Sequence, residues 1–289
     1  MGRKHPYIGG LIGADPLLSG SPRPGVSNLG ALGGDSGDAN WDDVVLLMDG
    51  TSTTTDLSAT QTVTEIGTDT ALSNEADPFG NTVNVLDFNR VGTGTNAISG
   101  IQVANSPIVF GSSPFTIEMW VKVDAIGSAQ YLYSDRHPSL TFVLFRVDDD
   151  GRLRFFRSVV GGVQGSFLGA TVLSPDTWYH VALTYDGSTL RMFLDGNLDG
   201  SSNQSNLNFN SNTNPVLGYD PSSTDSQHAY YSGQLVGQMA QVRVTKGVAR
   251  DIAADWTAGV YNSPMPQGPL LTRPTRRWGC GIAGGAETP

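Results

Sequence analysis

The sequence predicts an all-β protein, a two-sheet antiparallel jelly-roll sandwich with extended irregular N- and C-terminal arms. Apolar and polar residues alternate with a period of two through most of residues 41–262, which is the pattern of half-buried strands. Asp150-Gly151 and Asp186-Gly187 separate pairs of such segments, and Asp-Gly supplies the positive φ that a tight hairpin turn needs. Both ends of the chain are rich in Gly, Pro and Ser and show no sustained period.

The individual strands follow in order along the chain. Two-residue alternation, bounded by turn residues, predicts strands at 44–48, 83–88, 115–123, 142–147, 152–157, 178–185, 189–195, 215–219 and 235–245. About ten to twelve short strands in one β domain are typical of a sandwich or jelly roll. The only helical pattern lies at 248–258. In 241–245 we expect Val242 and Val244 to point inward, and Gln241, Arg243 and Thr245 to point outward.

The chain therefore divides into an N-terminal arm (1–40), a β domain (41–262) and a C-terminal arm (263–289). Prolines in the C-terminal segment preclude a helix. Free Gly- and Pro-rich tails normally fray, so we expect both arms to be held by a partner subunit, within a homo-oligomer or a larger assembly. The predicted anchor is the basic C-terminal group Arg273, Arg276, Arg277 and Trp278.

Charge and composition exclude several partners. Seventeen basic and 27 acidic residues give a net charge of −10, which argues against nucleic acid and against an anionic membrane. Cys280 is the single cysteine, so no intrachain disulfide is expected, as in chains made in a reducing cytoplasm. The apolar stretch near the N-terminus is interrupted by Gly9, Gly10 and Gly13, so we do not expect it to be a signal peptide.

Five segments of the β domain resemble one family. They are VVLLMDG (44–50), FGNTVNVLDF (79–88), FTIEMWVKV (115–123), WYHVALTYDGSTLRMFLDG (178–196) and QVRVTKGVAR (241–250). Together they resemble the laminin-G-like, concanavalin A-like jelly-roll domains, most of all those of bacteriophage structural proteins. The resemblance implies the jelly-roll fold and a place in a virion, after synthesis in the bacterial host cytoplasm. The phage-type pattern usually carries an acidic pair before the VR of the last segment, where this chain has Ala240 and Gln241.

The sequence lacks the residues of an enzyme on this fold, so we predict no catalytic residues. Glucanases need two closely placed carboxylates, whereas Glu65, Glu75, Glu118 and Glu287 are scattered. We expect Glu118 to pair with the basic residue that follows on the same face of its strand, Lys122. No serine lies in a nucleophile elbow. The four histidines and Cys280 are not grouped for catalysis, and we interpret His180 as a structural residue of its strand.

No cofactor is predicted, and calcium is the one ion that the family resemblance suggests. Asp148-Asp149-Asp150 is the densest acidic loop, and Asp220 and Asp225 lie in another. Asp150-Gly151 already forms a turn, and adjacent carboxylates repel one another, so we assign no metal site. Glycan binding requires exposed aromatic rings. The aromatic side chains of a polar stretch offer them, although each is equally suited to sealing the sandwich edge: Tyr219, His228, Tyr230 and Tyr231.

Two functions fit these observations. The first is a structural component of a phage virion, a capsid decoration (cement) protein or a short tail-associated protein that binds capsid or tail proteins through its arms. The second is a carbohydrate-binding adhesin that recognises host-surface glycans through rim loops. Removing the arms separates the two hypotheses, because it abolishes particle binding under the first and spares sugar binding under the second.

Overall fold

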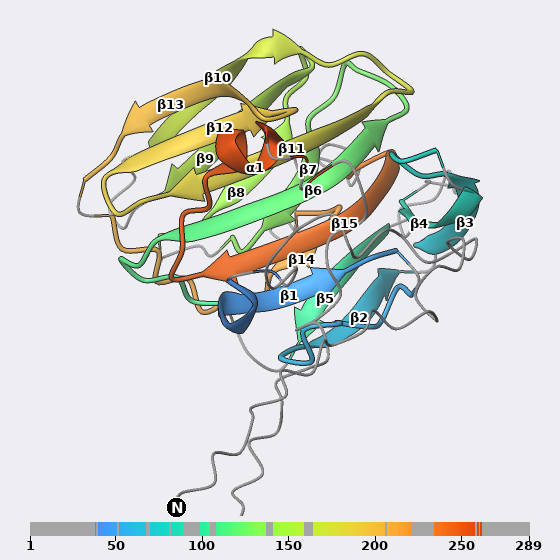
Figure 1. The fold of residues 1–289 in the computed structure, drawn as a ribbon, viewed down its shortest axis with the longest axis horizontal. Helices are drawn as coiled ribbons and strands as arrows, with labels where there is room; N and C mark the ends of the chain where they lie inside the picture. Colours follow the sequence, from blue (N-terminus) through green and yellow to red (C-terminus); the bar gives the residue numbers. More distant parts are fainter. Residues whose placement is uncertain are drawn as a thin grey trace, which may run out of the picture. The chain divides into compact units, whose positions relative to one another are not determined.

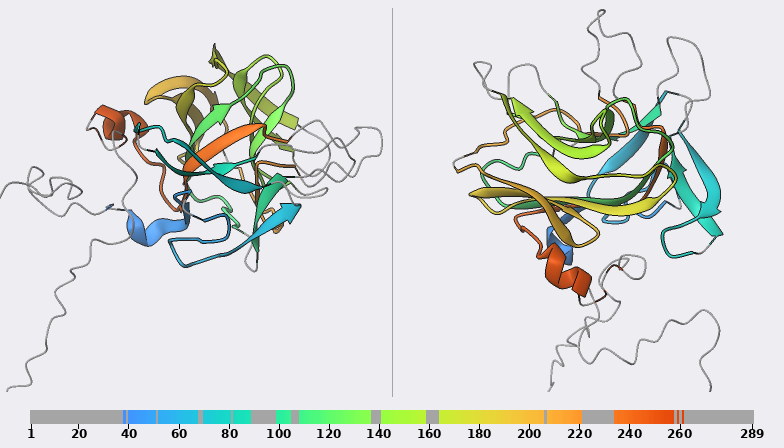
Figure 2. Two further views of the ribbon diagram at one scale, coloured as in Figure 1. Left: turned by 90° about the vertical axis from the view of Figure 1, so that its right-hand side faces the viewer. Right: turned by 90° about the horizontal axis from the view of Figure 1, so that it is seen from above.

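A computed structural model describes residues 38, 40–50, 52–67, 70–80, 82–88, 99–104, 108–136, 141–158, 164–205, 207–220, 234–257, 259 and 261. All of these residues belong to one compact unit, Gly37–Pro289. They form two antiparallel sheets, of eight and seven strands, that lie face to face as two layers (Figures 1 and 2). The predicted two-sheet jelly-roll sandwich is therefore confirmed.

The strands of the first sheet lie in the order β13 (Asn197–Asn203), β12 (Thr189–Leu194), β11 (Trp178–Tyr185), β6 (Phe115–Val123), β15 (Gly237–Lys246), β4 (Thr82–Asp87) and β3 (Ala71–Ala76). Strand β1 (Val44–Met48) also pairs with β15. The second sheet has the order β10 (Gln164–Val172), β9 (Arg152–Ser158), β8 (Leu144–Val147), β7 (Gln130–Ser134), β14 (Val216–Leu217), β5 (Ser99–Ala104) and β2 (Thr62–Gly67). A 3₁₀ turn (Trp41–Asp43) precedes β1, and helix α1 (Ile252–Thr257) follows β15, within the predicted helical stretch.

The main core fills the space between the two sheets. In β11, Val181, Leu183 and Tyr185 point into it, as the alternation predicts. Both Asp-Gly hairpins form: Gly151 (φ 82°) turns β8 into β9, and Gly187 (φ 95°) turns β11 into β12. Asp186 stabilises the second turn, because its carboxylate accepts the backbone N–H of Ser188 and of Thr189.

Part of the outer face of the first sheet is buried as well, by a second apolar cluster. Trp120, Ala182 and Phe193 on the sheet pack there with Ile252 and Tyr261, and Figure 2 shows α1 on this outer side. The predicted outward direction of Arg243 and Thr245 is confirmed, because both side chains point away from the main core. They are nevertheless buried: the chain around α1 covers them, and only 1% and 0% of their surfaces are exposed.

Gln241 departs from the predicted alternation for a backbone reason. It has φ 52° and lies in a β-bulge, so that two residues of β15 oppose one residue of β6 between Ala240 and Arg243. The bulge changes the phase of the strand. Met239 and Val242 both face the main core, and β15 pairs with β4 before the bulge and with β1 after it.

The described residues form fifteen strands rather than the predicted ten to twelve. The strands that the pattern missed include β3 (ALSNEA) and β13 (NLDGSSN), which are polar and carry residues typical of turns. They lie at the ends of the first sheet, where one neighbour suffices to satisfy the backbone and little side-chain burial is needed.

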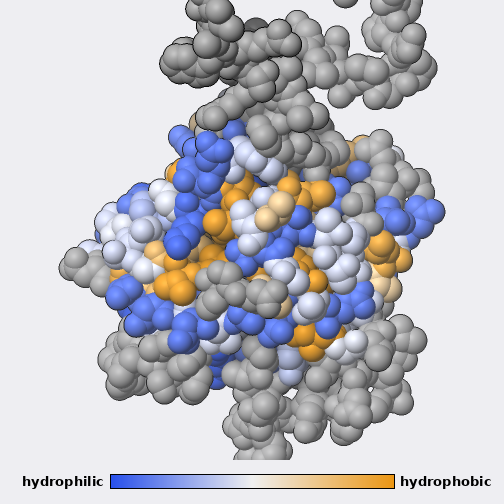
Figure 3. All heavy atoms as spheres, turned by 90° about the horizontal axis from the view of Figure 1, so that it is seen from below, coloured by the Kyte–Doolittle hydropathy of each residue, from blue (hydrophilic) through white to orange (hydrophobic). Residues whose placement is uncertain are grey.

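Outside the two cores, the surface is mixed in polarity. In Figure 3 the coloured residues form small apolar patches separated by polar ones. Among the described residues, no helix is long and apolar enough to cross a membrane.

Candidate functional site

A recess of about 170 Å³ lies on the outer face of the second sheet. Its walls combine aromatic, aliphatic and guanidinium groups: Tyr131, Arg136, Leu144, Arg146, Arg154 and Phe156. We call this set the arginine–aromatic recess. Tyr131, Leu144 and Phe156 also belong, with Phe142, to a small apolar cluster separate from the main core, and this cluster forms the apolar part of the site.

Strand register brings these side chains together. Arg146 of β8 stands directly opposite Tyr131 of β7 on one side and Arg154 of β9 on the other. Leu144 and Phe156 form the neighbouring cross-strand pair on the same face. The recess is therefore built on three adjacent strands of a rigid sheet.

Asp148 makes the Arg146–Arg154 pair possible, since like charges directly opposite one another destabilise a sheet. Its Oδ1 accepts a hydrogen bond from Arg146 Nη2 at 2.6 Å, and its Oδ2 accepts one from Arg154 Nη1 at 2.7 Å. Only 6% of the Asp148 side chain is exposed. The carboxylate lies behind the two guanidinium groups, neutralises part of their charge and fixes their orientation.

The remaining polar groups of the recess are held in a similar way. Arg136 Nη1 donates to Asp220 Oδ2 at 2.8 Å, and its guanidinium carbon lies 5.9 Å from the centre of the Phe142 ring. Arg146 Nη1 donates to the Tyr131 hydroxyl oxygen at 3.2 Å. Burial, together with the charge of Asp220, raises the pKa of Tyr131, so its hydroxyl keeps a proton that it can donate.

This arrangement is suited to binding rather than to acid–base chemistry. Aromatic faces can pack against the C–H face of a sugar ring, and fixed polar groups can orient its hydroxyls. Hydrolysis of a glycoside would need two accessible carboxylates across the bond. The carboxylates next to the recess, Asp148 and Asp220, are 6% and 3% exposed in their side chains and are ion-paired to arginines.

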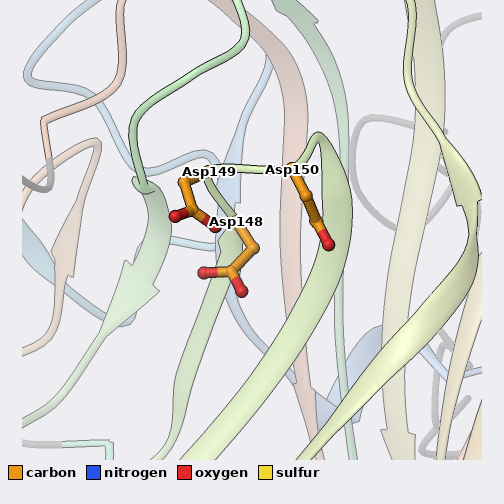
Figure 4. Close-up of side chains that lie close together, drawn as sticks. All are labelled: Asp148, Asp149 and Asp150. Atoms are coloured by element: carbon orange, nitrogen blue, oxygen red, sulfur yellow. The ribbon is translucent and has the colours of Figure 1, made fainter.

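The acidic turn Asp148–Asp150 does not fit a calcium ion. Oxygen atoms of the three side chains lie within 4.8 Å of one another, and Figure 4 shows the carboxylates at the β8–β9 turn. Both oxygens of Asp148 are bound to arginines, and Asp150 Oδ2 accepts from Arg152 Nη2 at 2.5 Å. To bind Ca²⁺, these carboxylates would have to give up their arginine partners, and the ion would lie beside several positively charged guanidinium groups.

A second polar cluster, which we call the buried ion network, lies on the outer face of the first sheet. Glu118 of β6 stands directly opposite Arg243 of β15, whose Nε donates to Glu118 Oε1 at 2.8 Å. The predicted pairing of Glu118 with Lys122 is therefore wrong. Lys122 lies four residues along the strand from Glu118, whereas Arg243 is the cross-strand neighbour of Glu118 and is in direct contact with it.

The buried ion network joins both ends of the described chain. Arg243 Nη1 donates to Asp38 Oδ2 at 2.9 Å, and Arg250 Nη2 donates to the same oxygen at 2.5 Å. The Tyr261 hydroxyl donates to Glu118 Oε2 at 2.8 Å. His180 Nε2 lies 3.4 Å from Glu118 Oε2, and both side chains are fully buried. His180 is thus part of β11 and inaccessible to a substrate, as its interpretation as a structural residue predicts.

Other predicted residues fall elsewhere. Tyr219 is half-buried and does not line the recess. His228, Tyr230, Tyr231 and Asp225 lie outside the described residues, as do the predicted anchor residues Arg273, Arg276, Arg277 and Trp278 and also Cys280. Sequence reasoning missed the recess, although the alternating Arg146, Asp148, Arg152 and Arg154 around one hairpin carried a signal of paired charges.

Comparison with known proteins identifies the family. A sequence profile described as the concanavalin A-like lectin/glucanases superfamily, of laminin G type, matches residues 95–250. The chain belongs to this superfamily. The resemblance found in the sequence motifs is therefore confirmed. Among curated protein sequences, none matches the chain.

Solved structures with the same fold include binding domains of toxins and one domain of an arabinanase. The binding domain of Paraclostridial mosquitocidal protein 1 is 16% identical with a TM-score of 0.57, over 75% of this chain and 52% of that one. Domain 4 of AbnA, an extracellular GH43 arabinanase from Geobacillus stearothermophilus, in complex with arabinotriose, is 13% identical with a TM-score of 0.56, over 73% and 97%. The receptor-binding domain of botulinum neurotoxin D is 12% identical with a TM-score of 0.56, over 77% and 54%. This chain spans about half the length of the two toxin domains.

Proposed function

We propose that this chain is a non-enzymatic carbohydrate-binding protein and that the arginine–aromatic recess is its binding site. The observation that carries the proposal is the combination, on one sheet face, of the partly exposed Phe156 ring with guanidinium groups fixed by buried carboxylates. Such a site provides stacking for a sugar ring and oriented donors for its oxygens. It lies on a sheet face and not in the rim loops that the sequence pointed to.

The structural relatives support a binding role. Domain 4 of AbnA was solved with arabinotriose, and the two toxin domains are described as binding domains. Fold alone does not determine function, so the residues of the recess carry the proposal.

A glycan array with the full chain and two variants tests this proposal. Phe156→Ala removes an aromatic wall of the recess, and Trp178→Ala, a half-buried aromatic on the outer face of the other sheet, is the matched control. We expect Phe156→Ala to reduce binding about tenfold or more, since stacking contacts are typically worth ~1–2 kcal/mol. Absence of glycan binding by the unaltered chain, or equal loss in both variants, would contradict the proposal.

A second proposal concerns the context in which the domain acts. We propose that the chain is a phage virion component, a capsid decoration or short tail-associated protein, held by its terminal segments. The phage-type motifs of the sequence suggest it. The buried ion network supports it, because Asp38, at the end of the N-terminal segment, and Tyr261, just before the C-terminal segment, are fixed to the same Glu118–Arg243 pair. A mechanical force applied to either terminal segment would therefore be transmitted to the core of the domain.

Co-sedimentation with phage particles that lack this protein tests the second proposal. The full chain is compared with a chain trimmed to residues 38–261, which keeps the whole buried ion network. We expect only the full chain to bind. Equal binding of both chains would place the attachment on the domain surface, and binding of neither would remove the support for a virion role.

A further inference from the structure

The charge of the recess differs from that of the chain as a whole. The chain has a net charge of −10, yet the ionisable side chains that line the recess are Arg136, Arg146, Arg154 and Tyr131, without a carboxylate. The acidic partners Asp148 and Asp220 lie behind the arginines, with 6% and 3% of their side chains exposed. The face presented to a ligand is therefore cationic, although the protein is acidic.

The arginines of the recess retain unused hydrogen-bond donors. A guanidinium group has five N–H donors. Among the described residues, the Arg154 and Arg136 side chains each use only Nη1, in their bonds to Asp148 and Asp220. The Nε atoms of Arg146 and Arg154 are buried and have no partner within the described part of the chain. These two Nε atoms are closed off from solvent, so an acceptor-rich ligand would bind the Nη donors that remain on Arg154 and Arg136, whose side chains are 30% and 40% exposed.

We propose that the recess recognises an acidic sugar, with the carboxylate of the sugar bound by Arg154 and Arg136 and its ring packed against the partly exposed Phe156. This inference rests on the proposed carbohydrate-binding function and adds the class of sugar. The planar fork of a guanidinium matches a carboxylate in bidentate geometry. Because Asp148 and Asp220 already hold the arginines, the ligand binds groups that lose little further freedom.

The dimensions of the recess agree with one acidic ring. A volume of about 170 Å³ is below that of pockets that enclose drug-sized ligands. The recess accommodates a single sugar unit, and the rest of a glycan would extend along the sheet surface. The side chains of Arg136 and Arg154 are 40% and 30% exposed, so both are within reach of a ligand that enters from solvent.

The test uses the full chain and sugars in pairs that differ in the acidic group. The pairs are oligogalacturonate and its methyl ester, sialyllactose and lactose, and glucuronic acid-bearing xylotriose and xylotriose, each titrated by calorimetry, with a sulfated lactose added. Arg154→Gln removes a guanidinium of the recess. Arg191→Gln is the matched control, because Arg191 on β12 has one aspartate partner, Asp186, at 2.6 Å and comparable exposure.

We expect the acidic member of at least one pair to bind about tenfold or more tightly than its neutral counterpart. Arg154→Gln should abolish this preference, whereas Arg191→Gln should preserve it. Neutral and acidic sugars could instead bind equally, with binding weakened by Phe156→Ala but not by Arg154→Gln. In that case the acidic-sugar inference is wrong and the carbohydrate-binding proposal stands. Stronger binding of the sulfated sugar overturns the carboxylate assignment. If no sugar of any pair binds, both proposals fail.

Discussion

Replacing Glu118 by glutamine should destabilise the domain severely. The substitution keeps the shape of the side chain and removes the negative charge that Arg243 contacts at 2.8 Å. Arg243 is 1% exposed, so its charge cannot be hydrated after the change, and Asp38 would be left as the carboxylate in direct contact with both Arg243 and Arg250. Removing one member of a buried ion pair costs about 3–5 kcal/mol. For a domain of this size that corresponds to a fall in Tm of about 6–20 °C.

Urea and thermal unfolding of the full chain measure this effect, with Arg191→Gln as the control. Asp186 pairs with Arg191 at the surface, where side chains are 32% and 36% exposed, and such a pair contributes at most about 1 kcal/mol. The double variant Glu118→Gln/Arg243→Met removes both charges of the buried pair and leaves Arg250 bound to Asp38. We expect it to regain about 1–3 kcal/mol relative to Glu118→Gln. A Glu118→Gln protein as stable as Arg191→Gln would refute the reasoning.

The carboxylate of Glu118 also makes the unfolding free energy depend on pH in the acidic range. Burial acts to raise the pKa of Glu118, but the charges of Arg243, His180 and Arg250 outweigh it and hold the pKa well below its ordinary value. A carboxylate with a lowered folded-state pKa contributes stability above its ordinary pKa, and that contribution is lost as the pH falls. We therefore expect the stability difference between the unaltered chain and Glu118→Gln to shrink as the pH drops below about 4.5.

Two further predictions concern single positions. Burial raises the pKa of Asp135 from 3.8 to about 8. Between about pH 4 and 8 the folded state therefore retains a proton that the unfolded state has lost, and the unfolding free energy measured with urea should fall by about 1.4 kcal/mol per pH unit. Asp135→Asn should remove this pH dependence, and an equal slope in the variant and the unaltered chain would contradict the assignment. A Cβ on Gly218 (φ 76°) would lie 2.4 Å from the Phe88 ring, whereas one on Gly80 (φ 78°) meets nothing within 4 Å. Gly218→Ala should therefore cost about 2–5 kcal/mol in unfolding free energy and Gly80→Ala only about 1–2 kcal/mol, and equal costs would exclude a role for the close approach.

The regular part of the fold was predictable because it depends on local patterns. Alternation in 178–185 requires only that one side of a strand be buried, and the Asp-Gly turns require only positive φ at one residue. The polar strands β3 and β13 were missed because backbone pairing at a sheet end forms them without an apolar face. The bulge at Gln241 was also missed, since the residue does not by its type specify a positive φ.

The candidate site depends on register, which the sequence pattern does not fix. Arg146 and Arg154 are recognisable as alternating charges in a hairpin, but their meeting with Tyr131 requires the pairing of β7 with β8. Arg136 enters the recess from beyond the end of β7 and is tied to Asp220, far along the chain. No local rule predicts such a contact. The same holds for the partner of Glu118, where cross-strand distance outweighs the neighbour on the same strand.

By itself, the sequence determined the fold class, the family, the hairpins and the lack of a glucanase-like grouping of carboxylates, because each is expressed in residues near one another in the chain. Only the tertiary structure decided which charged side chains are buried and which face a ligand. Arg243 is sealed beneath the chain around α1, and Arg154 remains open in a recess, although both are arginines at alternating positions of a strand. The physical reason is that burial of an outer sheet face depends on what packs over it, and the alternation of one strand carries no information about its cover.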